Sequence, residues 1–102
     1  MIDKKRTPYF EVPLSILKDK NIDKTSVCVS LYGWIMFLCS DKGFCTVSNE
    51  ELANFLGCGI NEISNGLYDL IVNGYVYIKM VIDDKQSRPT RMIYIKGKAK
   101  WQ

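Results

Sequence analysis

The side chains of this sequence are better suited to recognising nucleic acid than to catalysis. The chain contains no histidine, and none of its serines lies in a nucleophile motif, so an acid–base pair for catalysis is missing. Amides and hydroxyls instead gather between residues 61 and 68, where they could hydrogen-bond the edges of bases. The DNA-binding candidates in this segment are Asn61, Ser64, Asn65 and Tyr68. We therefore expect no catalytic residues, no cofactor and no enzyme activity.

The basic residues that could neutralise phosphates follow this segment and are absent from it. Residues 43–78 carry four acidic and no basic side chains, a net charge of −4, whereas residues 79–102 have a net charge of +5. Lys and Arg supply much of the affinity for DNA because they release counterions from its phosphates. The phosphate-binding candidates are Lys79, Lys85, Arg88 and Arg91. We expect base readout and electrostatic attraction to come from different elements.

The acidic segment also supports a second interpretation, in which its surface docks on a basic host protein. A helix that enters a DNA groove ordinarily carries positive charge, and this segment carries the opposite sign. A protein-binding module, such as an inhibitor or regulator from a mobile element, would carry negative charge at its docking surface. The candidate residues for this alternative are Glu50, Glu51, Glu62 and Asp69.

The pattern of apolar residues predicts two short helices around a glycine turn. Ser48 and Glu51 have the spacing of a capping box, which predicts the start of the first helix. Gly57 and Gly59 allow the turn, and Asn61 is expected to cap the second helix. Gly66, inside that helix, indicates close approach of either a neighbouring helix or a partner's backbone. The residues at helical spacing that should face the core are Ile63, Leu67, Leu70 and Ile71.

After the second helix the pattern changes to that of strands. β-Branched and aromatic residues predict a strand over residues 75–82 and another over residues 90–96, joined by a polar turn. A shorter strand is expected at residues 44–47. This order predicts a helix-turn-helix followed by a two-stranded hairpin.

The longest predicted helix covers residues 25–40, with Asp23 as its expected cap and a short helix at residues 14–17 before it. Apolar residues occupy nearly all sides of the long helix, which predicts burial on nearly all sides. Its small residues Ser26, Ser30 and Gly33 form one stripe. This stripe is consistent with close packing inside the domain or with the seam of a homodimer.

The four cysteines lack the spacing of a zinc site, so no bound metal is expected. Their apolar neighbours predict buried, reduced thiols, which are typical of a cytoplasmic protein. Residues 1–6 lack the apolar core of a signal peptide, so none is expected, and the longest apolar run, residues 31–39, is too short to span a membrane. We expect one domain over residues 10–96, with a basic arm at residues 1–9 and a basic tail at residues 97–102.

Several segments together resemble the N-terminal winged-helix domain of plasmid and phage replication initiators. They are FEVP at 10–13, LYGWI at 31–35, KGFCTVSNEELA at 42–53, LGC at 56–58 and LIVNGYV at 70–76. The resemblance implies a mainly α fold with a small β wing (α+β), a winged helix-turn-helix. It also implies binding of double-stranded DNA in replication initiation or transcriptional regulation in a phage, plasmid or other mobile element. Because initiators usually continue into further domains, the chain is either a free-standing regulator or a piece of a longer protein.

Overall fold

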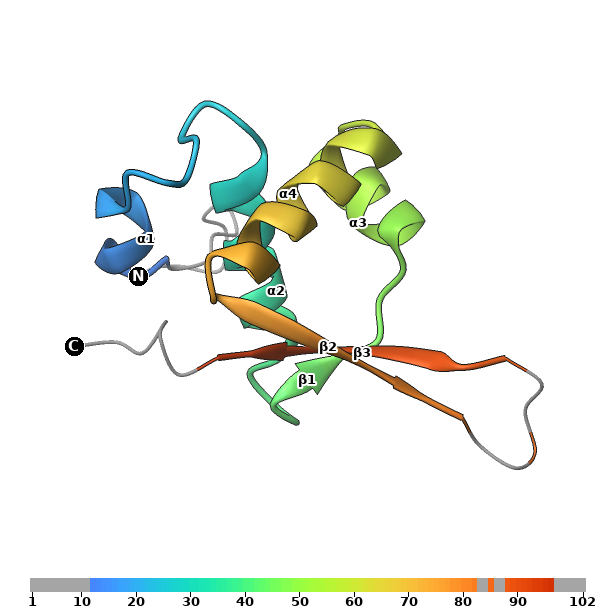
Figure 1. The fold of residues 1–102 in the computed structure, drawn as a ribbon. Helices are drawn as coiled ribbons and strands as arrows, with labels where there is room; N and C mark the ends of the chain where they lie inside the picture. Colours follow the sequence, from blue (N-terminus) through green and yellow to red (C-terminus); the bar gives the residue numbers. More distant parts are fainter. Residues whose placement is uncertain (1–11, 83–84, 86–87, 97–102) are drawn as a thin grey trace, which may run out of the picture.

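The computed structural model describes residues 12–82, 85 and 88–96; the expected basic arm and basic tail lie outside this part. Over these residues the chain forms an α+β fold with four helices and a three-stranded antiparallel sheet. The helices lie together on one side of the sheet (Figure 1). In chain order the elements are α1 Leu14–Lys18, α2 Cys28–Leu38, β1 Phe44–Cys45, α3 Asn49–Leu56, α4 Ile60–Val72, β2 Val76–Val81 and β3 Thr90–Ile95.

The sheet has β3 at its centre, between β1 and β2. The register pairs Ile93 of β3 with Cys45 on one side and Ile78 on the other, and all three side chains point toward the helices. The β2–β3 hairpin continues past the helices at its turn end (Figure 1). The predicted strands are confirmed with slightly shorter bounds, since alternation of apolar residues specifies a strand well and its last residue poorly.

The helix pair α3–α4 begins at the predicted capping box. The Ser48 hydroxyl accepts from the Glu51 amide at 3.1 Å, and the Ser48 amide donates to the Glu51 carboxylate at 2.9 Å. Gly57 then ends α3 in the left-handed region, at φ 71°. The prediction that Asn61 caps α4 is wrong, because the helix begins earlier in the chain. Gly59 is the extended N-cap, and its amide donates to the Glu62 carboxylate at 2.9 Å.

Helix α2 is shorter than the range 25–40 predicted for it, and Asp23 does not cap it. The Asp23 carboxylate instead accepts from the Thr25 amide and hydroxyl, at 2.9 and 2.6 Å, and so closes a local turn. The helix begins at Cys28, whose amide donates to the Ser26 hydroxyl at 3.1 Å. An aspartate side chain can accept hydrogen bonds from backbone amides in a turn as well as at a helix N-terminus. Here it does so in a turn, and the helix begins after that turn.

The core lies between α2, α4 and the sheet, with Leu31, Ile35, Leu70 and Ile93 fully buried. Gly66 of α4 is also buried there, and a Cβ at this position would lie 3.2 Å from Leu31 Cδ2. The prediction of close helix packing at Gly66 is therefore confirmed.

Two expectations for the helix faces are confirmed only in part: Ile63, Leu67, Leu70 and Gly33 are buried, but three other residues are exposed. Ile71 is 39% exposed. Asn49, the first residue of α3, contacts Ser64 of α4, so α3 does not extend along α4 as far as Ile71. Ser26 and Ser30 are also exposed, so no described element packs on that part of the small-residue stripe. A homodimer seam on this stripe stays a prediction.

No helix in the described ranges is long and apolar enough to cross a lipid bilayer.

Candidate nucleic-acid interface

The exposed side of α4 carries an uncharged polar stripe. Asn61, Asn65 and Tyr68 are all exposed, and their spacing of four and three residues places them on one face. The Tyr68 side chain is 65% exposed. This face is opposite the buried Ile63 and Leu70, so its amides and hydroxyl are directed to solvent. The structure thus brings three of the four predicted base-reading residues together.

Ser64, the fourth of these residues, lies on the flank of α4 that borders α3. Its hydroxyl accepts a hydrogen bond of 3.3 Å from the Asn49 side-chain amide. The hydroxyl is exposed and keeps its own proton for donation. Ser64 therefore joins α4 to the start of α3 and lies at the edge of the stripe.

Arg91 of β3 is half-buried against the start of α3. Its Nη1 donates to Asn49 Oδ1 at 2.8 Å, and its Nη2 donates to the Val47 carbonyl at 2.7 Å. Burial lowers the pKa of Arg91, and the neighbouring Cys45 opposes this shift. Together with the Asn49–Ser64 bond, these contacts form a chain of hydrogen bonds from the hairpin through α3 to α4. Sequence reasoning missed Asn49, because no local pattern shows a partner 42 residues away.

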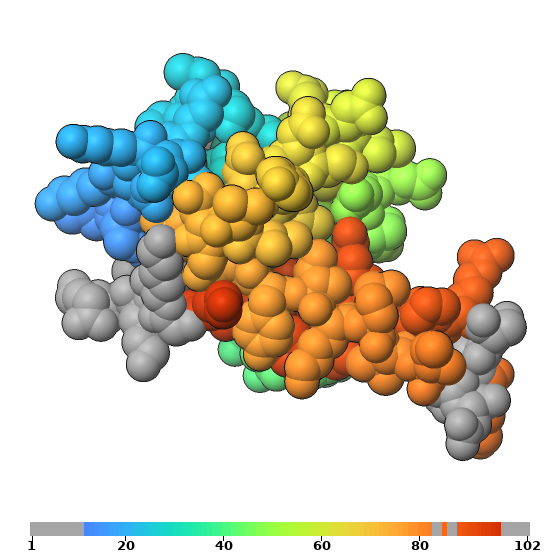
Figure 2. Space-filling model, viewed as in Figure 1, coloured from blue at the N-terminus to red at the C-terminus, as the bar shows by residue number. Residues whose placement is uncertain are grey.

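The other basic candidates are exposed on the hairpin, and they do not all share Arg91's side of the sheet. Lys79 pairs with Met92, and the next pair in the register is Met80 with Arg91. Because side chains alternate along a strand, the Lys79 side chain lies on the opposite face of the sheet from that of Arg91. Its Nζ lies 5.5 Å from the ring centroid of Tyr94. Lys85 and Arg88 lie near the hairpin turn. Figure 2 shows the hairpin projecting from the body of the molecule beside α4.

The acidic residues of the alternative interpretation are partly used by the helices themselves. Glu51 and Glu62 accept from the amides of Ser48 and Gly59, where a helix N-terminus favours negative charge. Glu50 is exposed in the first turn of α3. Asp69, like Glu62, lies on the flank of α4 that includes Gly66 and borders α2. The stripe of Asn61, Asn65 and Tyr68 lies between these acidic residues and Ser64.

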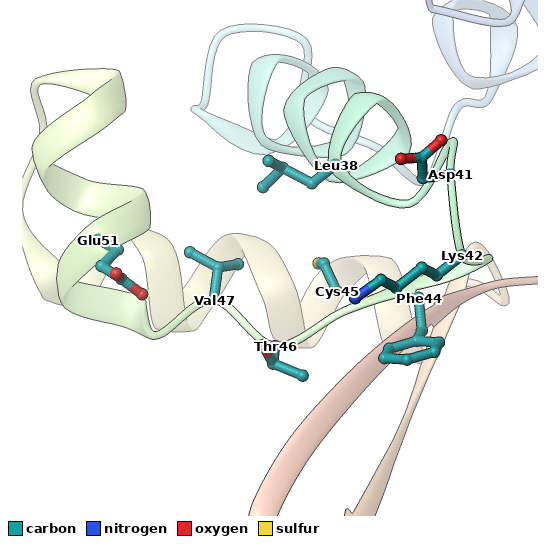
Figure 3. Close-up of a pocket in the computed structure, with 8 residues that line it drawn as sticks. All are labelled: Leu38, Asp41, Lys42, Phe44, Cys45, Thr46, Val47 and Glu51. Atoms are coloured by element: carbon teal, nitrogen blue, oxygen red, sulfur yellow. The ribbon is translucent and has the colours of Figure 1, made fainter.

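An open pocket of about 440 Å³ lies between the end of α2, β1 and the start of α3. Figure 3 shows the residues that line it, which are Leu38, Asp41, Lys42, Phe44, Cys45, Thr46, Val47 and Glu51. Interaction with Cys39 lowers the pKa of Cys45, and the Val47 backbone and Arg91 act in the same direction against burial. None of the DNA-binding candidates lines this pocket.

The fold is similar to a solved structure, that of the transcriptional regulator homologue protein from Pyrococcus horikoshii OT3. The similarity covers 84% of this chain and 76% of the other, with a TM-score of 0.52 and 17% sequence identity. At this identity the two chains are shown to share a fold. No protein-family model matches the sequence, and no curated protein matches it.

Proposed function

We propose that this chain is a winged-helix protein that binds double-stranded DNA. Helix α4 would enter the major groove, and the β2–β3 hairpin would act as the wing along the neighbouring backbone. The observation that carries the proposal is the exposed stripe of Asn61, Asn65 and Tyr68 on the second helix of a helix-turn-helix, next to a basic hairpin.

In this arrangement, base recognition and electrostatic attraction to the phosphates come from different elements. Asparagine amides can bond adenine bidentately, so Asn61 and Asn65 supply sequence preference without charge. Lys79, Lys85 and Arg88 supply the phosphate contacts. The basic segments 1–9 and 97–102 would add further phosphate contacts, as basic arms do in other DNA-binding proteins.

The biological role we propose is transcriptional regulation or replication initiation in a phage, plasmid or other mobile element, in the cytoplasm. The fold shared with a transcriptional regulator homologue supports regulation. The resemblance of segments such as residues 42–53 to replication initiators supports the second role. A homodimer formed through α2 would present two copies of α4 to a two-fold symmetric site.

The test is fluorescence anisotropy with a random duplex, measured from low to physiological salt. The double variant Lys79→Ala, Arg88→Ala should bind more weakly and reduce the slope of log affinity against log salt by about 2, because two phosphates are no longer neutralised. Lys20→Ala is the matched control, since Lys20 is exposed in the loop after α1. No binding of the unmodified chain at low salt would set the proposal aside.

A second candidate function is docking on a basic host protein. It is favoured by the net charge of −4 over residues 43–78, which leaves α3 and α4 without any basic side chain. The charge-reversal variant Glu62→Lys, Asp69→Lys should then abolish capture of that partner, with Glu50→Gln as a milder comparison. If the reversal instead strengthens duplex binding and leaves capture of every partner unchanged, the docking function is wrong.

A further inference from the structure

Three aromatic rings form one row on the face of the sheet that points away from the helices. The register places Phe44 of β1 opposite Tyr94 of β3, and Tyr94 opposite Tyr77 of β2. The ring planes of Tyr94 and Tyr77 are within 6° of parallel, with centroids 4.9 Å apart, and the Phe44 centroid is 5.6 Å from that of Tyr94. In Figure 3 the Phe44 ring points away from α2, whereas Cys45 and Val47 point toward the helices. The row thus lies on a different surface from the α4 stripe.

The charge on this face is positive. Lys79 Nζ lies 5.5 Å from the centroid of Tyr94, and Lys96 Nζ lies 6.0 Å from that of Tyr77. Both lysines are exposed, and the three strands contain no aspartate or glutamate. Each ammonium group is attracted to the negative face of a ring and remains on a flexible stem. A polyanion that approaches the rings would therefore meet two cations and no acid from the strands.

The row ends at an edge of the sheet. Strand β2 pairs with β3 alone, so Tyr77 is the last ring, and its side chain is 37% exposed. Within the described ranges no further ring continues the row past Tyr77. Cross-strand aromatic pairs stabilise sheets, and this accounts for the contacts between the rings. It does not account for the exposure of the terminal ring or for the two lysines beside the row.

We propose that this face, made of Phe44, Tyr94, Tyr77, Lys79 and Lys96, binds single-stranded DNA. An unpaired base continues the row by stacking at Tyr77, and the two ammonium groups bind the phosphates on either side. Rings select unpaired bases, because the bases of a duplex already stack on one another and present only their edges in the grooves. The choice of DNA over RNA rests on the proposed function. The ring row and its positive charge are observed in the structure and do not depend on that function.

The test compares a fluorescent oligothymidine with a fluorescent duplex by anisotropy at low salt. Tyr77→Thr keeps a strand-forming residue and should weaken oligothymidine binding by about tenfold or more, as expected for the loss of one stacking ring. Its duplex affinity should be unchanged. Tyr68→Thr is the matched control on α4 and should leave oligothymidine binding unchanged. Lys96→Gln, beyond the last residue of β3, should weaken oligothymidine binding severalfold and reduce its salt dependence.

Photo-cross-linking locates the contact directly. An oligothymidine containing 5-iodouracil should cross-link to Tyr77, Tyr94 or Phe44. Absence of oligothymidine binding at low salt, cross-links confined to α4, or full affinity in Tyr77→Thr would each overturn the proposal. Equal or tighter binding of an oligouridine RNA would overturn the choice of DNA. If oligothymidine binds through the rings and the duplex does not bind, the proposed duplex function fails while this inference stands.

Discussion

Arg91 of β3 donates a hydrogen bond of 2.8 Å to Asn49, the first residue of α3, and this bond joins the hairpin to the helix pair. Asn49 in turn donates to Ser64 of α4. Two residues that the sequence suggested as DNA contacts, Arg91 and Ser64, are therefore linked through a third residue. Their structural role is to set the position of the hairpin relative to α4.

Replacing Arg91 with lysine should reduce the stability of the fold. A lysine ammonium cannot reproduce the two guanidinium bonds to Asn49 and the Val47 carbonyl, and we expect a loss of about 1–2 kcal/mol in the free energy of unfolding. Urea unfolding measures this loss, with Arg88→Ala, at an exposed residue on the same hairpin, as a control that should leave stability unchanged. If Arg91→Lys is as stable as the parent yet binds the duplex more weakly, Arg91 acts at a phosphate and not through Asn49.

Replacing Asn65 with alanine should reduce sequence discrimination and leave the salt dependence of duplex binding unchanged. Asn65 is exposed at the centre of the α4 stripe and carries no charge. Removing a bidentate pair of hydrogen bonds to a base costs about 1–3 kcal/mol of discrimination. The measurement compares a selected duplex with a random one, and Asn54→Ala, an exposed amide on α3, is the control. Equal weakening on both duplexes would contradict a base contact.

Replacing Gly66 with alanine should destabilise the fold despite the better helix propensity of alanine. The substitution gains about 1 kcal/mol of propensity, but its Cβ would meet Leu31 Cδ2 at 3.2 Å and Val27 Cγ1 at 3.4 Å. Overpacking of a core costs about 1–3 kcal/mol, so the expected net loss is about 1 kcal/mol. Thermal unfolding tests this, and Gly59→Ser, at an exposed N-cap, should be neutral or slightly stabilising. A stabilised Gly66→Ala variant would show that α2 and α4 separate easily.

Two buried tyrosines should respond oppositely to replacement by phenylalanine. The Tyr32 hydroxyl is buried without a hydrogen-bond partner among the described residues, and burial raises the pKa of Tyr32 to about 12. Tyr32→Phe should therefore leave stability unchanged or raise it by about 1 kcal/mol. The Tyr75 hydroxyl donates to the Asp19 carboxylate at 2.6 Å, so Tyr75→Phe should lose about 1–2 kcal/mol. Urea unfolding of both variants is the measurement, and a clear loss in Tyr32→Phe would indicate a partner for its hydroxyl.

Stability should rise with pH across the titration of Cys45. Interaction between the two buried thiols lowers the pKa of Cys45 and raises the pKa of Cys39, so folding favours a thiolate at Cys45. The contribution of a group whose pKa is lowered on folding is complete above its unfolded pKa, and it is lost as the pH falls through the folded value. Urea unfolding between pH 6 and 9 should show this slope, and Cys45→Ser should remove it.

Alkylation should modify Cys45 before Cys28, because burial raises the pKa of Cys28 to about 11.

Features that depend on a few neighbouring residues could be predicted from the sequence. The capping box of Ser48 and Glu51 and the alternation that specifies β2 and β3 were predicted, because each needs only contacts within the segment. The same local reasoning failed at the start of α4, where it chose Asn61 as the cap. Gly59 and Asn61 both suit the segment, and only the folded backbone shows that the helix begins at Ile60.

Features that depend on residues far apart in the chain were decided by the tertiary structure. The 42-residue separation of Arg91 and Asn49 leaves no periodic signal, and the row of Phe44, Tyr94 and Tyr77 exists only because β3 lies between β1 and β2. The sequence by itself determined which elements form and which charges they carry. The packing of the helices on the sheet decided which side chains meet, since strand order and helix contacts minimise the free energy of the whole chain and not of any one segment.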